Sequence, residues 1–544
     1  MTYQGPEILL SVSQIAELAN VGRSAVSNWP KRYRDFPEPR TVTPSGTLYD
    51  AAEVERWLIE KGRLSGPIPP QARLWSLTNV LRSAWQLTDV GDFIIGCLVY
   101  LEACARSESS PSGQVNVEQP DRWEQLRLAE NKDLVSTLRK VAARIEEANP
   151  QLADLIQPAF QTEPRPDSSL VAQMLDSITA SRNDDMPLSE LFEEVIDRLH
   201  SDDRFFDELD TPDDLGYLIQ RLAGPISGTV FDPAVGSGAL LLQATLLAQT
   251  EGRFPHAIGW DINEVTLRRA RARFFLYDVD ADLSAVDALS EAPNSDVRGS
   301  VVVLDPPLRQ VEWGDADLYL DPYWRYGRPS PTSADLAWIQ VALNSLEEGG
   351  RAVVVLAASD LTQEGRDQQV RQNIIDAQVV EAIVLLPPRM RRDTSAQLAV
   401  WVLRAPPVEV DPDYPILLID ASSLGRPSRT THSLDESDID RIAEMVQVFS
   451  EEPYLEIIYD PLLAERDATG EVNRDDTELF ATSRYPHQLV EANLNPRRYQ
   501  EAKVPDLEHL REEAVNLRFE LGQTAMRLDG QIADLFHSLG VHYE

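Results

Sequence analysis

Apolar residues follow two different patterns in this chain of 544 residues. Up to about residue 200 they recur every three or four positions, as on one face of a helix. Beyond residue 200, short apolar runs alternate with helical segments, which predicts a parallel sheet covered by helices. The helical runs are 74–87, 93–105, 123–145, 170–178 and 188–199. The expected strands are 229–231, 256–260, 281–285, 301–304, 350–356, 379–385 and 398–403. We therefore expect a helical domain followed by an α/β core.

The first 65 residues have a pattern of their own. Two short amphipathic helices flank the turn Asn20-Val21-Gly22, and Pro30 should end or kink the second helix early. A hairpin then turns at Pro44-Ser45-Gly46, before a helix over 51–59. This order resembles the winged helix-turn-helix of the MerR and excisionase type. In that type the wing precedes a Tyr-Asp and a Val-x-x-Trp-Leu helix, here Tyr49-Asp50 and 54–58.

Polar side chains on or just after the second helix are of the types that contact base edges and phosphates. They are Arg23, Ser24, Ser27, Asn28, Lys31 and Arg32. The segment's eight basic residues equal its eight acidic residues, so contact with another protein is the alternative to contact with DNA.

Composition divides the rest of the chain. Residues 65–70 read Ser-Gly-Pro-Ile-Pro-Pro, a stiff linker, and apolar residues at 507–539 approach heptad spacing, which requires a partner helix in this chain or another. We predict five segments. They are 1–65, a winged helix-turn-helix; 66–200, a helical domain; 201–410, the α/β core; 411–500, a C-terminal extension of the core; and 501–544, a coiled-coil-like helical tail.

The charge and composition limit the class of protein. The formal net charge of −39 repels phosphate, which argues against a broad DNA-binding face but leaves a local patch or a basic partner subunit open. Such a surface also serves solubility alone. Cys97 and Cys104 are the only cysteines and lie in a helical pattern, so we expect them to be buried thiols rather than a zinc site or a disulfide. No apolar run reaches the roughly 20 residues of a membrane helix, and the start lacks a signal-peptide pattern. We expect a cytoplasmic protein without membrane contact.

The candidate chemistry falls at the carboxyl ends of the predicted strands, where ligands bind in such sheets. The strand predicted at 229–231 continues through Asp232-Pro233-Ala234-Val235 into Gly236-Ser237-Gly238, where glycines let a ligand approach the backbone. A Gly-x-Gly turn alone also arises for steric reasons. However, Asp261 ends the next strand at the spacing at which a doubly wound fold offers a carboxylate to ribose hydroxyls.

A second turn follows the strand at 301–304. Leu304-Asp305-Pro306-Pro307-Leu308 places a carboxylate at the strand end, and two prolines fix its backbone. Chemistry at an amino nitrogen requires an acceptor for the N–H protons, which an Asp side chain and a proline carbonyl can supply. With the glycine turn, Asp261 and Asp287, this order resembles the N6-adenine DNA methyltransferases. It is most similar to the modification subunits of type I restriction-modification systems.

The resemblance covers roughly residues 200–500. It includes Thr211-Pro212, where that family has a segment that folds over the cofactor, as well as 333–339, 346–356, and Leu494-Asn495-Pro496. The resemblance implies a Rossmann-like, S-adenosylmethionine-dependent methyltransferase core. It also implies DNA, a specificity-type subunit that meets the C-terminal tail, and a nuclease or translocase subunit as partners, with a homodimer open.

The resemblance also implies a role for each matching residue. The cofactor's amino acid end would contact Thr211, Pro212, Asp232, Ala234, Gly236 and Gly238. Asp261 would bind its ribose and Asp287 its adenine. Asp305 and the carbonyl of Pro306 would hold the N6 amino group of an adenine flipped out of the duplex, with Pro307 and Leu308 completing the turn. No metal is implied.

Leu308 departs from the family pattern, which has an aromatic ring at this position to stack on the flipped base. Stacking of this kind contributes roughly 1–3 kcal/mol per base. Trp313, Tyr323, Trp324 and Tyr326 follow and are candidates to replace the ring, or else pack in the core. Leu308 motivates the alternative of a catalytically impaired, methyltransferase-like DNA-binding, scaffold or regulatory subunit. Methylation of RNA or of protein glutamine is a third reading.

Overall fold

The computed structural model describes most of the chain before residue 501. The described residues are 9–19, 21–43, 46–64, 74, 77–78, 81, 85–109, 115–129, 133–163, 165, 167–183, 186–202, 210–291, 295–314, 322–392, 394–454, 458–459 and 479–500. The predicted tail at 501–544, the wing turn at 44–45 and half of the helical run at 74–87 lie outside these residues.

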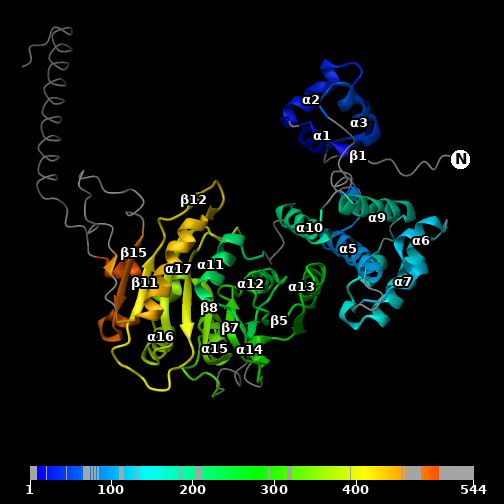
Figure 1. Cartoon of the computed structure of the whole chain (residues 1–544). Helices are drawn as coiled ribbons and strands as arrows, with labels where there is room; N and C mark the ends of the chain where they lie inside the picture. Colours follow the sequence, from blue (N-terminus) through cyan, green and yellow to red (C-terminus); the bar gives the residue numbers. More distant parts are fainter. Residues whose placement is uncertain are drawn as a thin grey trace, which may run out of the picture. The chain divides into compact units, whose positions relative to one another are not determined.

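The N-terminal segment contains three helices and a small sheet. The helices are α1 (Val12–Leu18), α2 (Arg23–Arg32) and α3 (Ala51–Glu60), and the strands β1 (Leu9–Ser11), β2 (Pro39–Thr43) and β3 (Gly46–Asp50) pair in the order β1-β3-β2 (Figure 1). Trp57 packs against Trp29 and Phe36, with ring centroids 5.1 and 4.9 Å away. The early stop expected at Pro30 is wrong, because α2 continues to Arg32. Pro30 lies in the last turn, where it removes a single backbone donor.

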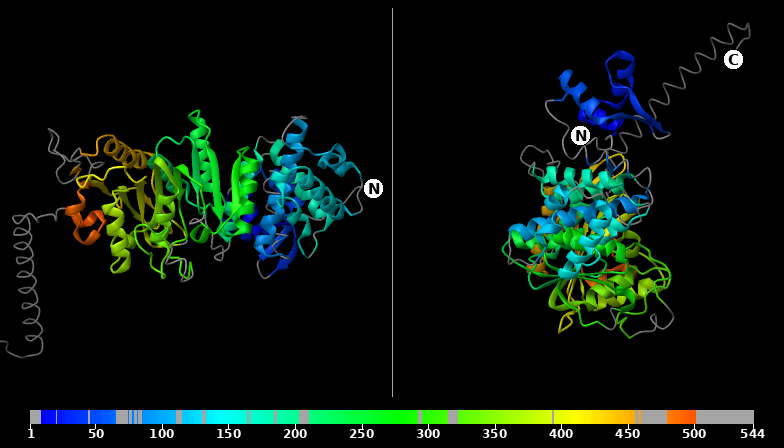
Figure 2. Two further views of the ribbon diagram at one scale, coloured as in Figure 1. Left: turned by 90° about the horizontal axis from the view of Figure 1, so that it is seen from below. Right: turned by 90° about the vertical axis from the view of Figure 1, so that its right-hand side faces the viewer.

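The regular elements in the described parts of residues 85–202 are helices joined by turns and loops (Figure 2). The helices are α5 (Leu87–Ser109), α6 (Trp123–Leu128), α7 (Leu134–Ala148), α8 (Gln157–Gln161), α9 (Ser168–Asn183) and α10 (Leu188–Asp202), with 3₁₀ turns at Gln119–Asp121 and Pro150–Leu152. The helical run predicted at 123–145 is therefore two helices. Cys97 and Cys104 are buried free thiols, as expected. Ala272 and Leu276 of the following core join the apolar cluster of these helices, so the two parts share packing.

The core is a ten-stranded sheet in the order β14-β15-β11-β9-β10-β8-β7-β4-β5-β6. Its strands are β4 (Thr229–Asp232), β5 (His256–Asp261), β6 (Ala281–Ala285), β7 (Gly299–Leu304), β8 (Leu346–Ala357), β9 (Val380–Pro388), β10 (Gln397–Arg404), β11 (Ile416–Asp420), β14 (Ile458–Tyr459) and β15 (Phe480–Arg484). All seven predicted strands are present. A separate hairpin pairs β12 (Arg426–Pro427) with β13 (His432–Ser433).

The strands from β6 to β8 are parallel, as predicted, but the sheet as a whole is mixed. β10 runs antiparallel to both β8 and β9. The connection from β9 to β10 spans only 389–396, which is too short for the crossover that a parallel neighbour requires. This short connection carries Arg391, whose side chain reaches Asp305 directly after β7.

Helices cover both faces of the sheet. α11 (Asp213–Ala223), α12 (Ala239–Thr250) and α17 (Glu436–Glu451) pack with every second residue of the central strands, such as Val301, Val303 and Val353. In Figure 1, α14 (Ala288–Glu291), α15 (Asp335–Asn344) and α16 (Arg366–Asp376) lie on the other side of the strands. α13 (Glu264–Leu276) packs on β5 and β6 and on α5. Short 3₁₀ turns occupy Ala358–Leu361, Pro486–Gln488, Val490–Ala492 and Pro496–Tyr499.

None of the helices in the described part of the chain combines the length and apolarity needed to cross a bilayer.

Candidate active site

A cavity at the carboxyl ends of β4 and β7 brings together five of the predicted site residues. Thr211, Asp232, Ala234, Gly236 and Asp305 all line it. We call it the turn cavity. Parallel neighbours β4 and β7 end at the same edge of the sheet, which is why turns 70 residues apart in sequence meet here.

The two glycines of the turn serve different purposes. Gly236 has φ 55° and Gly238 has φ 85°, values that favour glycine. A Cβ on Gly236 would meet nothing within 4 Å, whereas one on Gly238 would lie 3.0 Å from the Cβ of Ala270 on α13. Gly236 therefore borders open space, and the bare backbone at Gly238 allows close packing of α13. Gly238 is not among the residues that line the turn cavity.

Asp232 and Asp261 concentrate acidic groups behind the glycine turn. Asp232 is 1% exposed, and burial raises the pKa of its carboxyl well above the usual value, helped by the nearby charges of Asp261 and Asp305. The backbone N–H of Ala234 donates to the Asp232 carboxylate at 3.0 Å, and this hydrogen bond lowers the pKa. Asp261 accepts from the N–H of Gly236 at 2.9 Å and of Asn263 at 2.7 Å. Asp261 thus fixes the turn, although it does not line the turn cavity.

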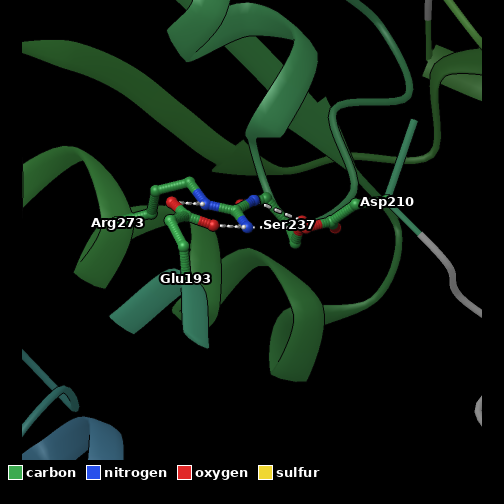
Figure 3. Close-up of polar contacts among 4 residues, drawn as sticks. All are labelled: Glu193, Asp210, Ser237 and Arg273. Atoms are coloured by element: carbon green, nitrogen blue, oxygen red, sulfur yellow. Dashed lines mark hydrogen bonds and ion pairs between the residues drawn. The ribbon is translucent and has the colours of Figure 1, made fainter. Parts of the chain in front are cut away.

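A buried arginine joins the glycine turn to the helical segment (Figure 3). The side chain of Arg273 on α13 is 1% exposed and donates to Glu193 of α10 at 3.0 and 2.8 Å. It also donates to Asp210 at 2.6 Å and to the backbone oxygen of Ser237 at 2.8 Å. The Ser237 hydroxyl in turn donates to Asp210. We call these four residues the Arg273 network.

The Arg273 network was not predicted from the sequence. Its only local signal is an arginine between the apolar residues of α13, and long arginine side chains often extend to solvent from such positions. Burial raises the pKa of Glu193, while the charge of Arg273 lowers it. Removing Arg273 would leave two carboxylates without their cation.

Asp305 is held through both of its carboxylate oxygens. The Thr211 hydroxyl donates to Oδ2 at 2.9 Å, and Arg391 Nη1 donates to Oδ1 at 3.1 Å. The Asp305 side chain is 4% exposed and that of Arg391 12%. Thr211 was predicted as a site residue, but Arg391 was not. Arg391 lies 86 positions from Asp305 in the sequence, and its only local feature is the neighbouring Arg392.

The rest of the Asp305 turn is fixed by local contacts. Pro306 is buried and Pro307 exposed, and Leu308 is partly buried against the core. Arg309 has φ 53°, and its N–H donates to Asp335 at 2.8 Å. The backbone thus turns sharply away from the cavity directly after Leu308.

The aromatic rings considered as substitutes at Leu308 pack elsewhere. Trp313, Trp324 and Tyr326 are buried, and the Trp313 and Trp324 ring centroids are 5.4 Å apart. Tyr323 packs against Trp324 at 5.1 Å. None of the four lines the turn cavity. Their packing agrees with the reading that they belong to the core.

Pro212 lies on a second cavity, which shares Asp210, Thr211 and Ala239 with the first. Arg391 and Arg392 also line it, and we call it the arginine cavity. Its volume of about 480 Å³ is within the range of small-molecule sites.

Asp287 lines neither cavity. It accepts from the N–H of Leu289 at 3.1 Å and from the Ser290 hydroxyl at 2.8 Å, at the start of α14. These contacts are typical of a helix-capping acid. Its assignment to the cofactor's adenine therefore stays a prediction.

The six residues predicted to contact DNA are exposed on α2. Ser27 donates to the backbone of Arg23 at 3.1 Å, and Asn28 donates to that of Ser24 at 2.9 Å. In the described part of the chain, no three His, Cys, Asp or Glu side chains are grouped so that they could hold a metal ion.

The class of protein follows from a family comparison. Residues 185–485 match the family described as N-6 DNA Methylase, which is more than half of the chain. The chain belongs to this family.

Two curated relatives are methylase subunits of type I restriction enzymes. The chain is 26% identical over 246 residues to the type I restriction enzyme HindI methylase subunit of Haemophilus influenzae, covering 44% of this chain and 55% of the relative. It is 29% identical over 289 residues to the type I restriction enzyme MpnII methylase subunit of Mycoplasma pneumoniae, covering 50% of this chain and 52% of the relative. The chain therefore spans about half the length of the curated relatives it matches.

The fold is similar to that of a solved type I restriction-modification methyltransferase subunit from Streptococcus thermophilus. The TM-score is 0.64 at 20% identity, covering 79% of this chain and 98% of that one. A modification subunit of a putative type I restriction enzyme from Vibrio vulnificus gives a TM-score of 0.55 at 14% identity, covering 81% of this chain and 98% of that one. At these identities the likeness establishes the fold.

Proposed function

We propose that this chain is the methyl-transferring subunit of a restriction-modification or phage-defence system, acting on the N6 amino group of adenine in DNA. The observation that carries the proposal is the placement of Asp305 in one cavity with Thr211 and the glycine turn. This arrangement supports a role for Asp305 as an acceptor for amino protons beside a candidate cofactor pocket. Membership of the N-6 DNA methylase family supports the same reaction.

S-adenosylmethionine fits the chemistry of the turn cavity. Its walls carry the carboxylates of Asp210, Asp232 and Asp305, and a ligand with an ammonium and a sulfonium group would offset their charge. Gly236 leaves open space beside the backbone. When bound, this cofactor supplies a methyl group on a positively charged sulfur.

The residues that would hold the cofactor are those implied by family resemblance. Thr211, Pro212, Asp232, Ala234, Gly236 and Gly238 would hold its amino acid end, with Asp261 at the ribose and Asp287 at the adenine.

Asp305 would act on the amino group that is methylated. Its carboxylate and the Pro306 carbonyl would accept the two N6–H groups, which directs the nitrogen lone pair toward the methyl carbon. As the new C–N bond forms, the bond between the methyl carbon and the sulfonium sulfur would break, and a neutral thioether would leave. The nitrogen gains the positive charge, which the carboxylate would stabilise until one N6 proton passes to solvent. Thr211 would keep the carboxylate oriented through its 2.9 Å hydrogen bond.

The partners are proposed from the net charge of this chain and from the names of its relatives. A net charge of −39 argues against a broad DNA-binding face, so a basic partner subunit would help this chain to hold a long DNA duplex. The relatives' names place them in type I restriction enzymes, so we propose a specificity-type subunit, together with a nuclease or translocase subunit. The exposed residues of α2 would contact DNA or one of these partners. A second copy of this chain is a further candidate.

The test is transfer of a labelled methyl group from S-adenosylmethionine to DNA from a host without adenine methylation. The enzyme would be the full chain, co-expressed with the subunits encoded beside it. We expect Asp305→Ala to reduce transfer at least about a hundredfold, because an acceptor at the reacting group is worth this much. Cofactor affinity should change by less than about threefold.

Asp282→Ala is the matched control, since Asp282 is an exposed aspartate paired with His256 at the far edge of the sheet. Equal transfer by the wild type and Asp305→Ala would refute the proposed role of Asp305.

A further inference from the structure

We propose that Arg391 contacts the target base. In the free protein the Arg391 guanidinium donates to the Asp305 carboxylate. When an adenine enters, the guanidinium lies over the face of the base, where Leu308 cannot stack because it has no aromatic ring. This inference rests on the proposed function and names a residue that neither the family resemblance nor the sequence assigns.

The position of Arg391 is set by the backbone around it. It lies in the short connection between β9 and β10, directly after Met390, which is 2% exposed in the core. Arg389, which precedes Met390, has φ 64°, and its carbonyl accepts from the N–H of His432 at 2.9 Å. A buried side chain and a hydrogen bond to another segment thus fix the start of the connection. The Arg391 side chain therefore begins from a defined place.

The contact with Asp305 places the guanidinium where the substrate must go. Arg391 Nη1 lies 3.1 Å from Asp305 Oδ1, and the Thr211 hydroxyl occupies Oδ2. An N6 amino group can reach Oδ1 only if Arg391 moves or shares that oxygen. Since the Arg391 side chain is 12% exposed, little water is available to replace it. A base that displaces the guanidinium will have this planar cation as its immediate neighbour.

The residues around Asp305 give the guanidinium a role toward the base. Leu308 has no π-face, and the rings of Trp313 and Trp324 are buried against each other and do not line the turn cavity. Arginine guanidinium planes stack on nucleic acid bases much as aromatic rings do. Arg391 lines the arginine cavity and brings such a planar group into contact with Asp305.

The experiment separates a planar role from a charge role. Transfer of labelled methyl groups to unmodified DNA would be measured for Arg391→Ala, Arg391→Lys and Arg391→Phe in the assembled enzyme. Lysine keeps the cation at Asp305 without a plane, and phenylalanine keeps a plane without the cation. We expect alanine and lysine to reduce kcat/KM about 10- to 100-fold, and phenylalanine to stay within about threefold of the wild type.

Cofactor affinity should stay close to wild type in all variants. The alanine and phenylalanine variants leave the buried Asp305 carboxylate without its cation and should therefore lower the unfolding temperature, whereas the lysine variant should lower it least. Arg391→Gln replaces the alanine variant if that one does not fold. Arg366→Ala, an exposed arginine of α16, is the matched control.

Activity that survives with lysine and is lost with phenylalanine would show a purely ionic role and overturn the inference. Equal activity of all variants would do the same, while leaving the proposed function intact. A wild type that transfers no methyl group would overturn both.

Discussion

The two halves of the candidate site are held in different ways. The glycine-turn half is fixed from several sides, by Asp261 on the Gly236 N–H and by the Arg273 network on Ser237. The other half, which would bind the target base, depends on the carboxylate of Asp305. Its two oxygens accept from Thr211 and Arg391. The backbone of the glycine turn is thus held in place in the free protein. In the second half, a ligand must replace or share the contact between Arg391 and Asp305.

This difference implies that cofactor binding and methyl transfer can be separated by mutation. Changes behind the glycine turn should alter cofactor affinity and stability together. Changes around Asp305 should alter transfer and leave affinity nearly unchanged. The predictions below test this separation.

The largest effect is expected for Arg273→Ala. Removing one member of a fully buried ion pair typically costs about 3–5 kcal/mol. Here the cost should be smaller, because the Glu193 and Asp210 side chains are 37% and 21% exposed and water can screen their charges. Glu193 and Asp210 would lose their cation, and Ser237 a donor to its backbone oxygen. We expect a markedly lower unfolding temperature and, by calorimetry, at least tenfold weaker binding of S-adenosylmethionine.

Arg268→Ala is the control for Arg273→Ala. Arg268 is on the same helix and pairs with Asp92 of α5 at 3.6 Å, with its side chain 22% exposed. It should lower stability slightly and leave cofactor affinity unchanged. Equal cofactor affinity for the wild type and a folded Arg273→Ala variant would show that Arg273 stabilises the fold without positioning the turn.

A smaller effect of opposite sign is expected for Leu308→Tyr. A ring at this position can stack on the base, and with Arg391 already beside Asp305 we expect a gain in kcat/KM of up to about tenfold. Leu308→Met, which adds no ring, should show no gain. A loss of transfer in the tyrosine variant would indicate that the leucine fills a space too small for an aromatic ring.

The smallest effect concerns pH. Burial raises the pKa of Asp232, so in the free protein this carboxyl stays protonated to a higher pH than an exposed aspartate does. A cationic ligand favours the ionised form, which lowers this pKa and releases protons on binding. Affinity for S-adenosylmethionine should therefore rise a few-fold as the pH is raised.

Titrations in buffers of different ionisation enthalpy would detect this proton release. Asp232→Asn should abolish it. Proton uptake by the wild type would contradict the assigned sign.

The sequence predicted the half of the site that rests on local pattern. Contiguous residues determine where a strand ends and which turn follows it. Asp232, Gly236 and Asp305 could therefore be expected to meet at one edge of the sheet. Thr211 came from family resemblance, and the structure adds its bond to Asp305.

What the sequence did not predict depends on long-range pairing. Arg391 reaches Asp305 across 86 positions, and Arg273 reaches Glu193 across 80. Nothing near an arginine in the sequence specifies which distant carboxylate it will meet. The same holds for β10, whose antiparallel direction follows from the short connection that also carries Arg391.

The most direct test of the account is the identity of the methylated nucleoside. DNA treated with the assembled wild-type enzyme and labelled S-adenosylmethionine would be digested to nucleosides and analysed by mass spectrometry. We predict that the label is in N6-methyladenine. Label in a cytosine derivative, in RNA or in protein, or no label in a protein that binds the cofactor, would contradict the assignment of Asp305 to an adenine amino group.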